Sequence, residues 1–130
     1  MVGIVIVSHS AKVAEGIVEL AAEMAAENGH IIAAGGLSDG GIGTDPLRIQ
    51  AAIEQADTGD GVAVLADIGS SIMSAETAIE FLEGSGIRVR IADAPVLEGA
   101  VSACAASAGG TSLDEVIAAA EEARGFSKLA

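Results

Sequence analysis

Two apolar runs of strand length constrain the fold of this chain most, because each ends at a side chain that can do chemistry. Residues 1–10 read MVGIVIVSHS and place His9 after the first run, and residues 61–67 read GVAVLAD and place Asp67 after the second. Runs without polar alternation suit strands that are covered on both faces, as in a parallel sheet. The sequence therefore predicts an α/β protein in which His9 and Asp67 follow buried strands.

Helical patterns alternate with the expected strands. Strands are expected within 1–10, 30–34, 61–67 and 87–93, and helices at about 12–27, 46–55, 72–82 and 97–107 and from 113 onward. With 130 residues, this order predicts one domain, 1–130, built as a three-layer sandwich with a mainly parallel four-stranded sheet and helices on both faces. With a strand order of 2-1-3-4, the first and third strands are neighbours, and the loops that follow them flank one crevice. His9 and Asp67 would then lie close together.

The first two helices carry patterns that predict which side chains are buried. In the first helix, a 4, 3, 4 spacing predicts one buried stripe made of Val13, Ile17, Leu20 and Met24. The next helix begins at Thr44 or Asp45, before Pro46, and is expected to bury Leu47, Ile49 or Ala52, and Ile53. Another face of the first helix carries a row of carboxylates, which is either a solvated face or a docking surface for a basic partner: Glu15, Glu19, Glu23 and Glu27.

Composition disfavours several classes of protein. The formal net charge is −13, and the six Lys and Arg residues are scattered, so the chain offers no basic cluster for nucleic acid. The first apolar run is too short for a membrane span and lacks the basic region of a signal peptide. The single cysteine, Cys104, cannot form an internal disulfide, which favours a reducing, cytoplasmic setting. Cys104 is expected to be a small packed side chain.

His9 is the candidate catalytic residue, and Asp67 is its candidate partner. A neutral imidazole is a competent nucleophile toward phosphorus, and a carboxylate on the other ring nitrogen would fix its tautomer. Hydroxyls and backbone N–H groups that could hold phosphoryl oxygens are expected at Ser10, Gly69, Ser70 and Ser71. From the residues alone, His9 could equally be a side chain that merely ends a strand, and Ser70 or Ser71 a simple helix cap.

Other chemistries are less well supported. We expect no metal site, because His9 and His30 fall at opposite ends of the predicted sheet and several ligands would have to converge. A Ser-His-Asp hydrolase would need a serine in a nucleophile-elbow context such as GxSxG, which neither serine beside His9 has. The glycine-rich stretch 35–44 lacks the established phosphate-binding strings and favours a flexible loop.

Four stretches in order resemble a known family. VGIVIVSHSAKVAEG (2–16), GGIGTD (40–45), LADIGSSIMSAETA (65–78) and DAPVLEGA (93–100) are similar to the phosphotransferase subunits of phosphoenolpyruvate-dependent dihydroxyacetone kinases. Those subunits are a branch of the mannose-type IIA family of the sugar phosphotransferase system. Relatives in sugar transport carry a GGSP-like string after the strand-3 aspartate, whereas this chain has GSSIMS (69–74), which, with the GGIGTD loop, favours the dihydroxyacetone branch.

The resemblance implies a relay. His9 would take a phosphoryl group from the phosphohistidine of HPr and pass it to ADP on a DhaL-type kinase subunit, which phosphorylates dihydroxyacetone. Asp67 would support His9, and Gly43, Thr44 and Asp45 would form the lip of the crevice. Nucleotide and Mg²⁺ would belong to the partner subunit, so no cofactor is expected on this chain, and the chain would be a homodimer.

Some family members continue into HPr-like and enzyme I-like domains. This sequence stops at Ala130, so its phosphate is expected to come from separate proteins, unless the sequence is part of a longer chain. Two alternatives remain: a mannose-type IIA component of a sugar transporter, and a non-catalytic interaction module on the same fold. The sequence does not decide which ring nitrogen of His9 would carry the phosphate.

Overall fold

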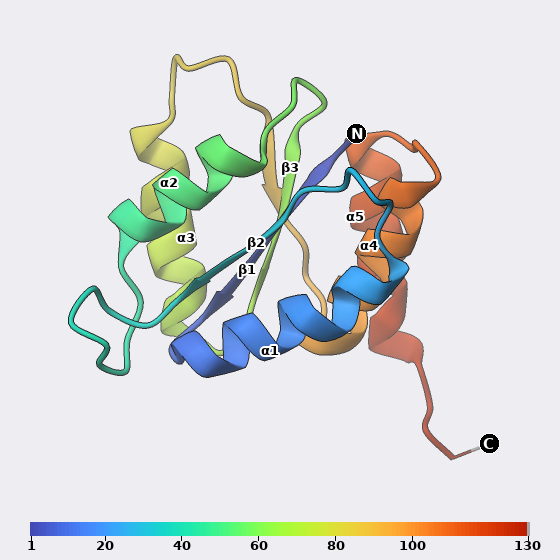
Figure 1. Cartoon of the computed structure of the whole chain (residues 1–130), viewed down its shortest axis with the longest axis horizontal. Coiled ribbons are helices and arrows are strands. Elements are labelled where there is room, and N and C mark those ends of the chain that lie inside the picture. The colour runs from blue at the N-terminus through green and yellow to red at the C-terminus, as the bar shows by residue number, and fades with distance from the viewer. Residues whose placement is uncertain (130) are drawn as a thin grey trace.

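Within residues 1–129, which the structure describes, four parallel strands form one sheet in the order β2-β1-β3-β4, covered by five α-helices (Figure 1). The structure is a computed structural model. The strands are β1 (Gly3–Ser8), β2 (Ile31–Gly35), β3 (Val62–Ala66) and β4 (Val89–Ile91). The helices are α1 (Ala11–Ala21), α2 (Pro46–Ala56), α3 (Ser70–Phe81), α4 (Val96–Ala108) and α5 (Leu113–Glu122), with 3₁₀ turns at Ala22–Met24 and Ala123–Gly125. The predicted fold class and strand order are confirmed.

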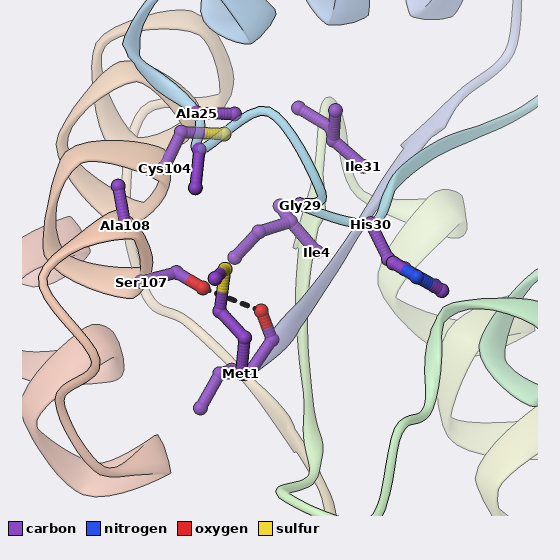
Figure 2. A pocket seen from close by; sticks show the side chains of 11 residues that line it. Met1, Ile4, Ala25, Gly29, His30, Ile31, Cys104, Ser107 and Ala108 are labelled. Carbon is purple, nitrogen blue, oxygen red and sulfur yellow. Dashed lines mark hydrogen bonds between the residues drawn. The ribbon is translucent and has the colours of Figure 1, made fainter.

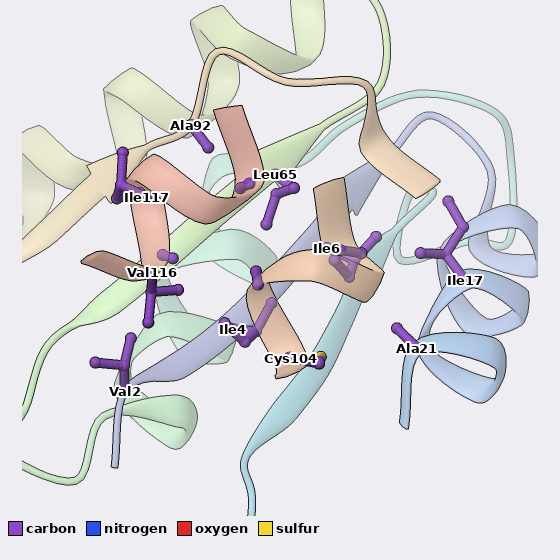
Figure 3. Close-up of a cluster of buried hydrophobic side chains, with 14 of the residues drawn as sticks. Val2, Ile4, Ile6, Ile17, Ala21, Leu65, Ala92, Cys104, Val116 and Ile117 are labelled. Atoms are coloured by element: carbon purple, nitrogen blue, oxygen red, sulfur yellow. The ribbon is translucent and has the colours of Figure 1, made fainter. Parts of the chain in front are cut away.

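The sheet divides the apolar interior into two layers because successive side chains of a strand point to opposite faces. Helices α1, α4 and α5 cover one face, and α2 and α3 cover the other (Figure 1). Figure 3 shows the first layer, whose members include Ile4, Ile6, Leu65, Val116 and Ile117. The second layer includes Val5, Val7, Val62, Val64 and Ile53. Both faces of β1 and β3 are therefore dry, as the unbroken apolar runs predict.

Helix α1 packs on the sheet mainly through alanines, so the stripe predicted for it is right for Ile17 and wrong for its other three members. Ala14, Ile17 and Ala21 are buried, whereas Val13, Leu20 and Met24 are about half exposed. The reason is the close approach of α1 to β2: a Cβ on Gly35 would lie 2.8 Å from the Ala14 Cβ. Larger side chains cannot occupy that contact. The α-helix also ends at Ala21, followed by the 3₁₀ turn, and does not reach residue 27.

Helix α2 begins as expected, with Asp45 as the N-cap and Pro46 in the first turn. Its buried face is Ile49, Ala52, Ile53 and Ala56. Leu47 is 65% exposed, so its predicted burial is wrong. The side chain of Leu47 lies in the first turn, at the end of the sheet where the chain leaves β2.

Cys104 and His30 lie near the amino ends of the strands. Cys104 is buried there beside a cavity of about 10 Å³, and burial raises the pKa of its thiol to about 11 (Figure 2). His30 is exposed at the same end, with its Nδ1 3.4 Å from the Gln55 carbonyl. Strand β4 lies at one edge of the sheet, and its exposed residue is Arg90. Within residues 1–129, no helix has the length and apolar character needed to cross a bilayer.

Candidate active site

His9 and Asp67 meet at the carboxyl ends of the two central strands. His9 follows β1 directly, and Asp67 follows β3, which is paired with β1 in parallel register. The Asp67 N–H continues the ladder by donating to the Val7 carbonyl at 3.1 Å. The His9 Nδ1 lies 3.0 Å from the Asp67 Oδ1. The structure thus brings together the two residues that the strand order places in one crevice.

Four donors hold the Asp67 carboxylate. Its Oδ1 accepts from the Ile68 N–H at 2.7 Å and from His9 Nδ1, and its Oδ2 accepts from the Ser8 hydroxyl at 2.8 Å and from the His9 N–H at 3.1 Å. Burial raises the pKa of Asp67, but these hydrogen bonds together outweigh burial and lower its pKa from the ordinary 3.8 to about 2. Asp67 is therefore ionised at neutral pH.

The ionised carboxylate fixes the tautomer of the His9 ring. A carboxylate can only accept, so Nδ1 must carry the proton of the 3.0 Å bond, and the lone pair of the neutral ring lies on Nε2. The Ser70 hydroxyl is 2.6 Å from Nε2 and donates to it. The His9 side chain remains 21% exposed. The arrangement presents a nucleophilic nitrogen near the surface, with one hydroxyl covering it.

The four residues expected to hold phosphate, Ser10, Gly69, Ser70 and Ser71, lie at the starts of α1 and α3 but make different contacts. Gly69 precedes α3 as its N-cap, and no side chain caps the helix, so neither Ser70 nor Ser71 has the capping role that was the alternative. The Ser71 hydroxyl is buried and donates to the Ile68 carbonyl. Ser10 caps α1 by accepting from the Val13 N–H at 3.3 Å. Of the three hydroxyls, the structure brings Ser70 alone into contact with the His9 ring.

The three residues expected at the lip of the crevice lie in the connection between β2 and α2. The Gly43 N–H donates to the His9 carbonyl at 2.8 Å, and Gly43 has a φ of +148°, a conformation that favours glycine. The Thr44 hydroxyl is 2.6 Å from that of Ser74, which ties this loop to α3. Asp45 faces α2, where it accepts from the Leu47 N–H at 2.9 Å. Gly43 therefore contacts His9 through the backbone, whereas Thr44 and Asp45 shape the loop around it.

Ser8 is a residue of the site that the sequence interpretation missed. It is the last residue of β1, it has no exposed surface, and its hydroxyl reaches Asp67. A signal was present in the sequence, because a polar side chain at a buried strand position must find a hydrogen-bond partner. The run of Val and Ile before Ser8 predicts that burial, and Asp67 follows the strand expected beside it.

A cleft of about 370 Å³ opens beside this network, between the carboxyl ends of β3 and β4. Its lining includes Asp67, Ile72, Ile91 and Asp93. Among residues 1–129, no three His, Cys, Asp or Glu side chains converge as a metal site would require. The chemistry available at the site is that of the imidazole, the carboxylate and the surrounding hydroxyl and N–H donors.

Comparison with known proteins gives consistent matches. The family profile described as the PTS system fructose IIA component (EIIA-man) matches residues 3–119. A relative from Klebsiella michiganensis, the phosphoryl donor subunit DhaM of a PEP-dependent dihydroxyacetone kinase, is 43% identical over 121 residues, which cover 90% of this chain and 26% of the relative. A DhaM from Listeria innocua is 43% identical over 108 residues, which cover 82% of this chain and 86% of the relative. The chain thus spans about a quarter of the first relative and most of the second.

Solved structures match the fold over nearly the whole chain. The crystal structure of a protein of unknown function, EF1359, superposes with a TM-score of 0.83 at 36% identity, covering 98% of this chain and 97% of the other. The phosphotransferase system component EIIA from Streptococcus agalactiae superposes with a TM-score of 0.70 at 14% identity, with the same coverage. At that identity, the second match supports the fold alone.

Proposed function

Because the chain belongs to the EIIA-man family of phosphotransferase-system IIA components, we propose that it relays a phosphoryl group through His9 as the phosphoryl donor subunit of a dihydroxyacetone kinase. One observation carries the proposal: Asp67 holds Nδ1 of His9 at 3.0 Å, which leaves the lone pair on Nε2. The relatives named DhaM phosphoryl donor subunits support the same role.

The first half of the relay loads the histidine. Nε2 of His9 attacks the phosphorus of the HPr phosphohistidine, a new N–P bond forms, and the N–P bond to the donor breaks with its electron pair returning to the donor ring. The His9 ring gains positive character as the bond forms, and ionised Asp67, through the Nδ1–H bond, stabilises that charge. The proton stays on Nδ1 throughout, so the step needs no external base.

The loaded state requires donors for the phosphoryl oxygens. The Ser70 hydroxyl covers Nε2 at 2.6 Å in the free protein, so it must turn aside as the phosphate arrives, and it then donates to a phosphoryl oxygen. The amino end of α3 begins at Ser70, beside the ring, and has no side-chain cap. Its first backbone N–H groups and the helix dipole favour negative charge there.

The second half of the relay unloads the histidine. The N–P bond of His9 breaks as a terminal oxygen of ADP, held on a DhaL-type subunit, attacks the phosphorus and gives ATP. That subunit then phosphorylates dihydroxyacetone, and nucleotide and Mg²⁺ stay with it, so this chain needs no cofactor of its own. Exposure of the His9 side chain supports this role, because the same nitrogen has to reach two different proteins in turn.

The setting of the relay is part of the proposal. We place it in the cytoplasm, where HPr and phosphoenolpyruvate are found and where a single buried cysteine such as Cys104 stays reduced. The family resemblance supports a homodimer.

The test is the intact mass of the protein after incubation with phosphoenolpyruvate, enzyme I and HPr, followed by the ADP-loaded kinase subunit and dihydroxyacetone. We expect one acid-labile phosphate on the wild type and on His30→Ala, but none on His9→Ala, and we expect it to disappear when kinase and triose are added. His30 is a matched control because it is the chain's other histidine and lies at the opposite end of the sheet. A phosphate that appears and stays would favour a sugar-transport IIA component. No phosphate on the wild type would favour a non-catalytic module.

A further inference from the structure

The Ser8 hydroxyl makes two hydrogen bonds that link the start of α1 to the Asp67 carboxylate. Ser8 is fully buried at the end of β1. Its Oγ lies 2.8 Å from the Asp67 Oδ2 and 3.1 Å from the backbone nitrogen of Ser10. Neither bond belongs to the strand ladder or to a helix cap, so both depend on a hydroxyl at this position.

The direction of both bonds follows from the donors available. The Ser10 N–H can only donate, so the Ser8 oxygen accepts from it, and the hydroxyl proton of Ser8 is then directed to Asp67. The Asp67 carboxylate receives two bonds on each oxygen. On Oδ2 these come from Ser8 and from the His9 N–H, and on Oδ1 from the Ile68 N–H and the His9 ring. Ser8 is the one side chain besides the His9 ring among these donors.

We propose that Ser8 is a positioning residue, which fixes the rotation of the Asp67 carboxylate so that Oδ1 faces Nδ1 of His9 and selects the tautomer with a free Nε2. The role in phosphoryl transfer rests on the relay proposed above, whereas the role in tautomer selection does not. Ser8 does not touch the reacting atoms, because Asp67 stands between it and the ring.

The effect of removing the hydroxyl follows from this geometry. In Ser8→Ala, Oδ2 keeps a single donor, the His9 N–H at 3.1 Å, and the Ser10 N–H loses its acceptor. The carboxylate can then rotate away from Nδ1, and an imidazole without a fixed partner populates both neutral tautomers. Molecules with the proton on Nε2 have no lone pair on that exposed nitrogen, so the fraction that can attack phosphorus falls. In the remaining molecules Nε2 is less well oriented toward the phosphorus.

The test measures the His9 tautomer and the phosphorylation rate in the same set of variants. ¹⁵N NMR of the imidazole at about pH 8 reports which nitrogen is protonated, and quenched-flow mass measurement with phosphorylated HPr reports the rate. We expect Ser8→Ala to show a mixture of tautomers and an about tenfold slower phosphorylation. Ser8→Thr keeps the hydroxyl and suits a strand position, and we expect it to restore both values.

Ser107→Ala is the matched control. Ser107 is also buried, and its hydroxyl donates to the Val2 carbonyl, just before the start of β1 and therefore at the opposite end of that strand from Ser8 (Figure 2). It should lose stability as Ser8→Ala does, but keep the wild-type tautomer and rate. A tautomer and rate in Ser8→Ala that match the wild type, or a loss that Ser8→Thr does not restore, would overturn the proposal. If even the wild type takes no phosphate, the relay fails, and the tautomer measurement still decides the role of Ser8.

Discussion

Replacing Asp67 with alanine should separate the chemical contribution of its carboxylate from the fold. Asp67→Ala removes the acceptor of the hydrogen bond from His9 Nδ1–H. Because Asp67 lies beyond the end of β3, the substitution leaves the apolar layers on both faces of the sheet intact. We expect the variant to fold. We also expect it to accept phosphate slowly and to hold it poorly, because the positive character of the phosphorylated ring then has no counter-charge.

The expected size of the effect can be worked out from the hydrogen bond that is lost. The Nδ1 to Oδ1 distance is 3.0 Å, and the acceptor is ionised because its pKa is about 2. A hydrogen bond to a charged group contributes about 1.5–3 kcal/mol. If the ring needs this bond fully in the transition state, the rate falls by roughly 10- to 150-fold, since about 1.4 kcal/mol corresponds to a factor of ten. Asp67→Asn keeps a carbonyl acceptor without the charge, so its phosphorylation rate should lie between those of the wild type and Asp67→Ala.

The assay is a single-turnover phosphorylation by phosphorylated HPr, quenched at intervals and analysed by intact mass. Asp93→Ala is the matched control, because Asp93 also follows a strand at this end of the sheet but is 82% exposed in an ion pair with Arg124. Exposed pairs of this kind contribute little, so its rate should stay near the wild-type rate. A rate for Asp67→Ala within about twofold of the wild type would remove the carboxylate from the mechanism.

Three further predictions concern pH, the hydroxyl at the ring and the acidic face of α1. The folded protein lowers the pKa of Asp67 from 3.8 to about 2, so its ionised form stabilises the fold above pH 3.8, and that contribution is lost as the pH falls through 2. Chemical denaturation gives the free energy of unfolding of the wild type and of Asp67→Ala at each pH. Between about pH 5 and pH 2, the wild-type value should fall by about 2 kcal/mol more than that of the variant. An equal fall in both proteins would contradict this. Ser70→Ala should shorten the lifetime of the phosphorylated protein about fivefold, because a hydrogen bond worth about 1 kcal/mol to the phosphate is lost. The loss of phosphate is followed over time by intact mass. An unchanged or longer lifetime would exclude contact between this hydroxyl and the phosphate. Glu19→Lys should leave both transfer steps within about twofold, because Glu19 is exposed on α1, and a large loss would instead make the acidic row a docking surface.

The sheet and the central pair of the site were predictable because few physical arrangements fit the two apolar runs. Strands without polar alternation must be covered on both faces, and neighbouring parallel strands end at the same edge, so His9 and Asp67 had to meet once β1 and β3 were adjacent. The last helix was also predictable, since a helix is expected from residue 113 onward and α5 begins at Leu113.

The failures come from contacts that depend on distances between elements. The spacing of Val13, Leu20 and Met24 suits a buried stripe, but the close approach of α1 to Gly35 selects the alanine face. The hydrogen-bond partner of each serine hydroxyl could not be predicted from the sequence either, because a serine can bond its own helix or a neighbouring element. Ser71 bonds the Ile68 carbonyl, Ser70 the His9 ring and Ser8 the Asp67 carboxylate.

The most direct test of the account is to locate the phosphate on the protein by NMR. Uniformly ¹⁵N-labelled protein, phosphorylated with phosphoenolpyruvate, enzyme I and HPr, should show ³¹P coupling to Nε2 of His9, with a proton retained on Nδ1. That result is predicted because Asp67 occupies the Nδ1 side of the ring at 3.0 Å. Coupling to Nδ1, or to a nitrogen of His30, would contradict the account.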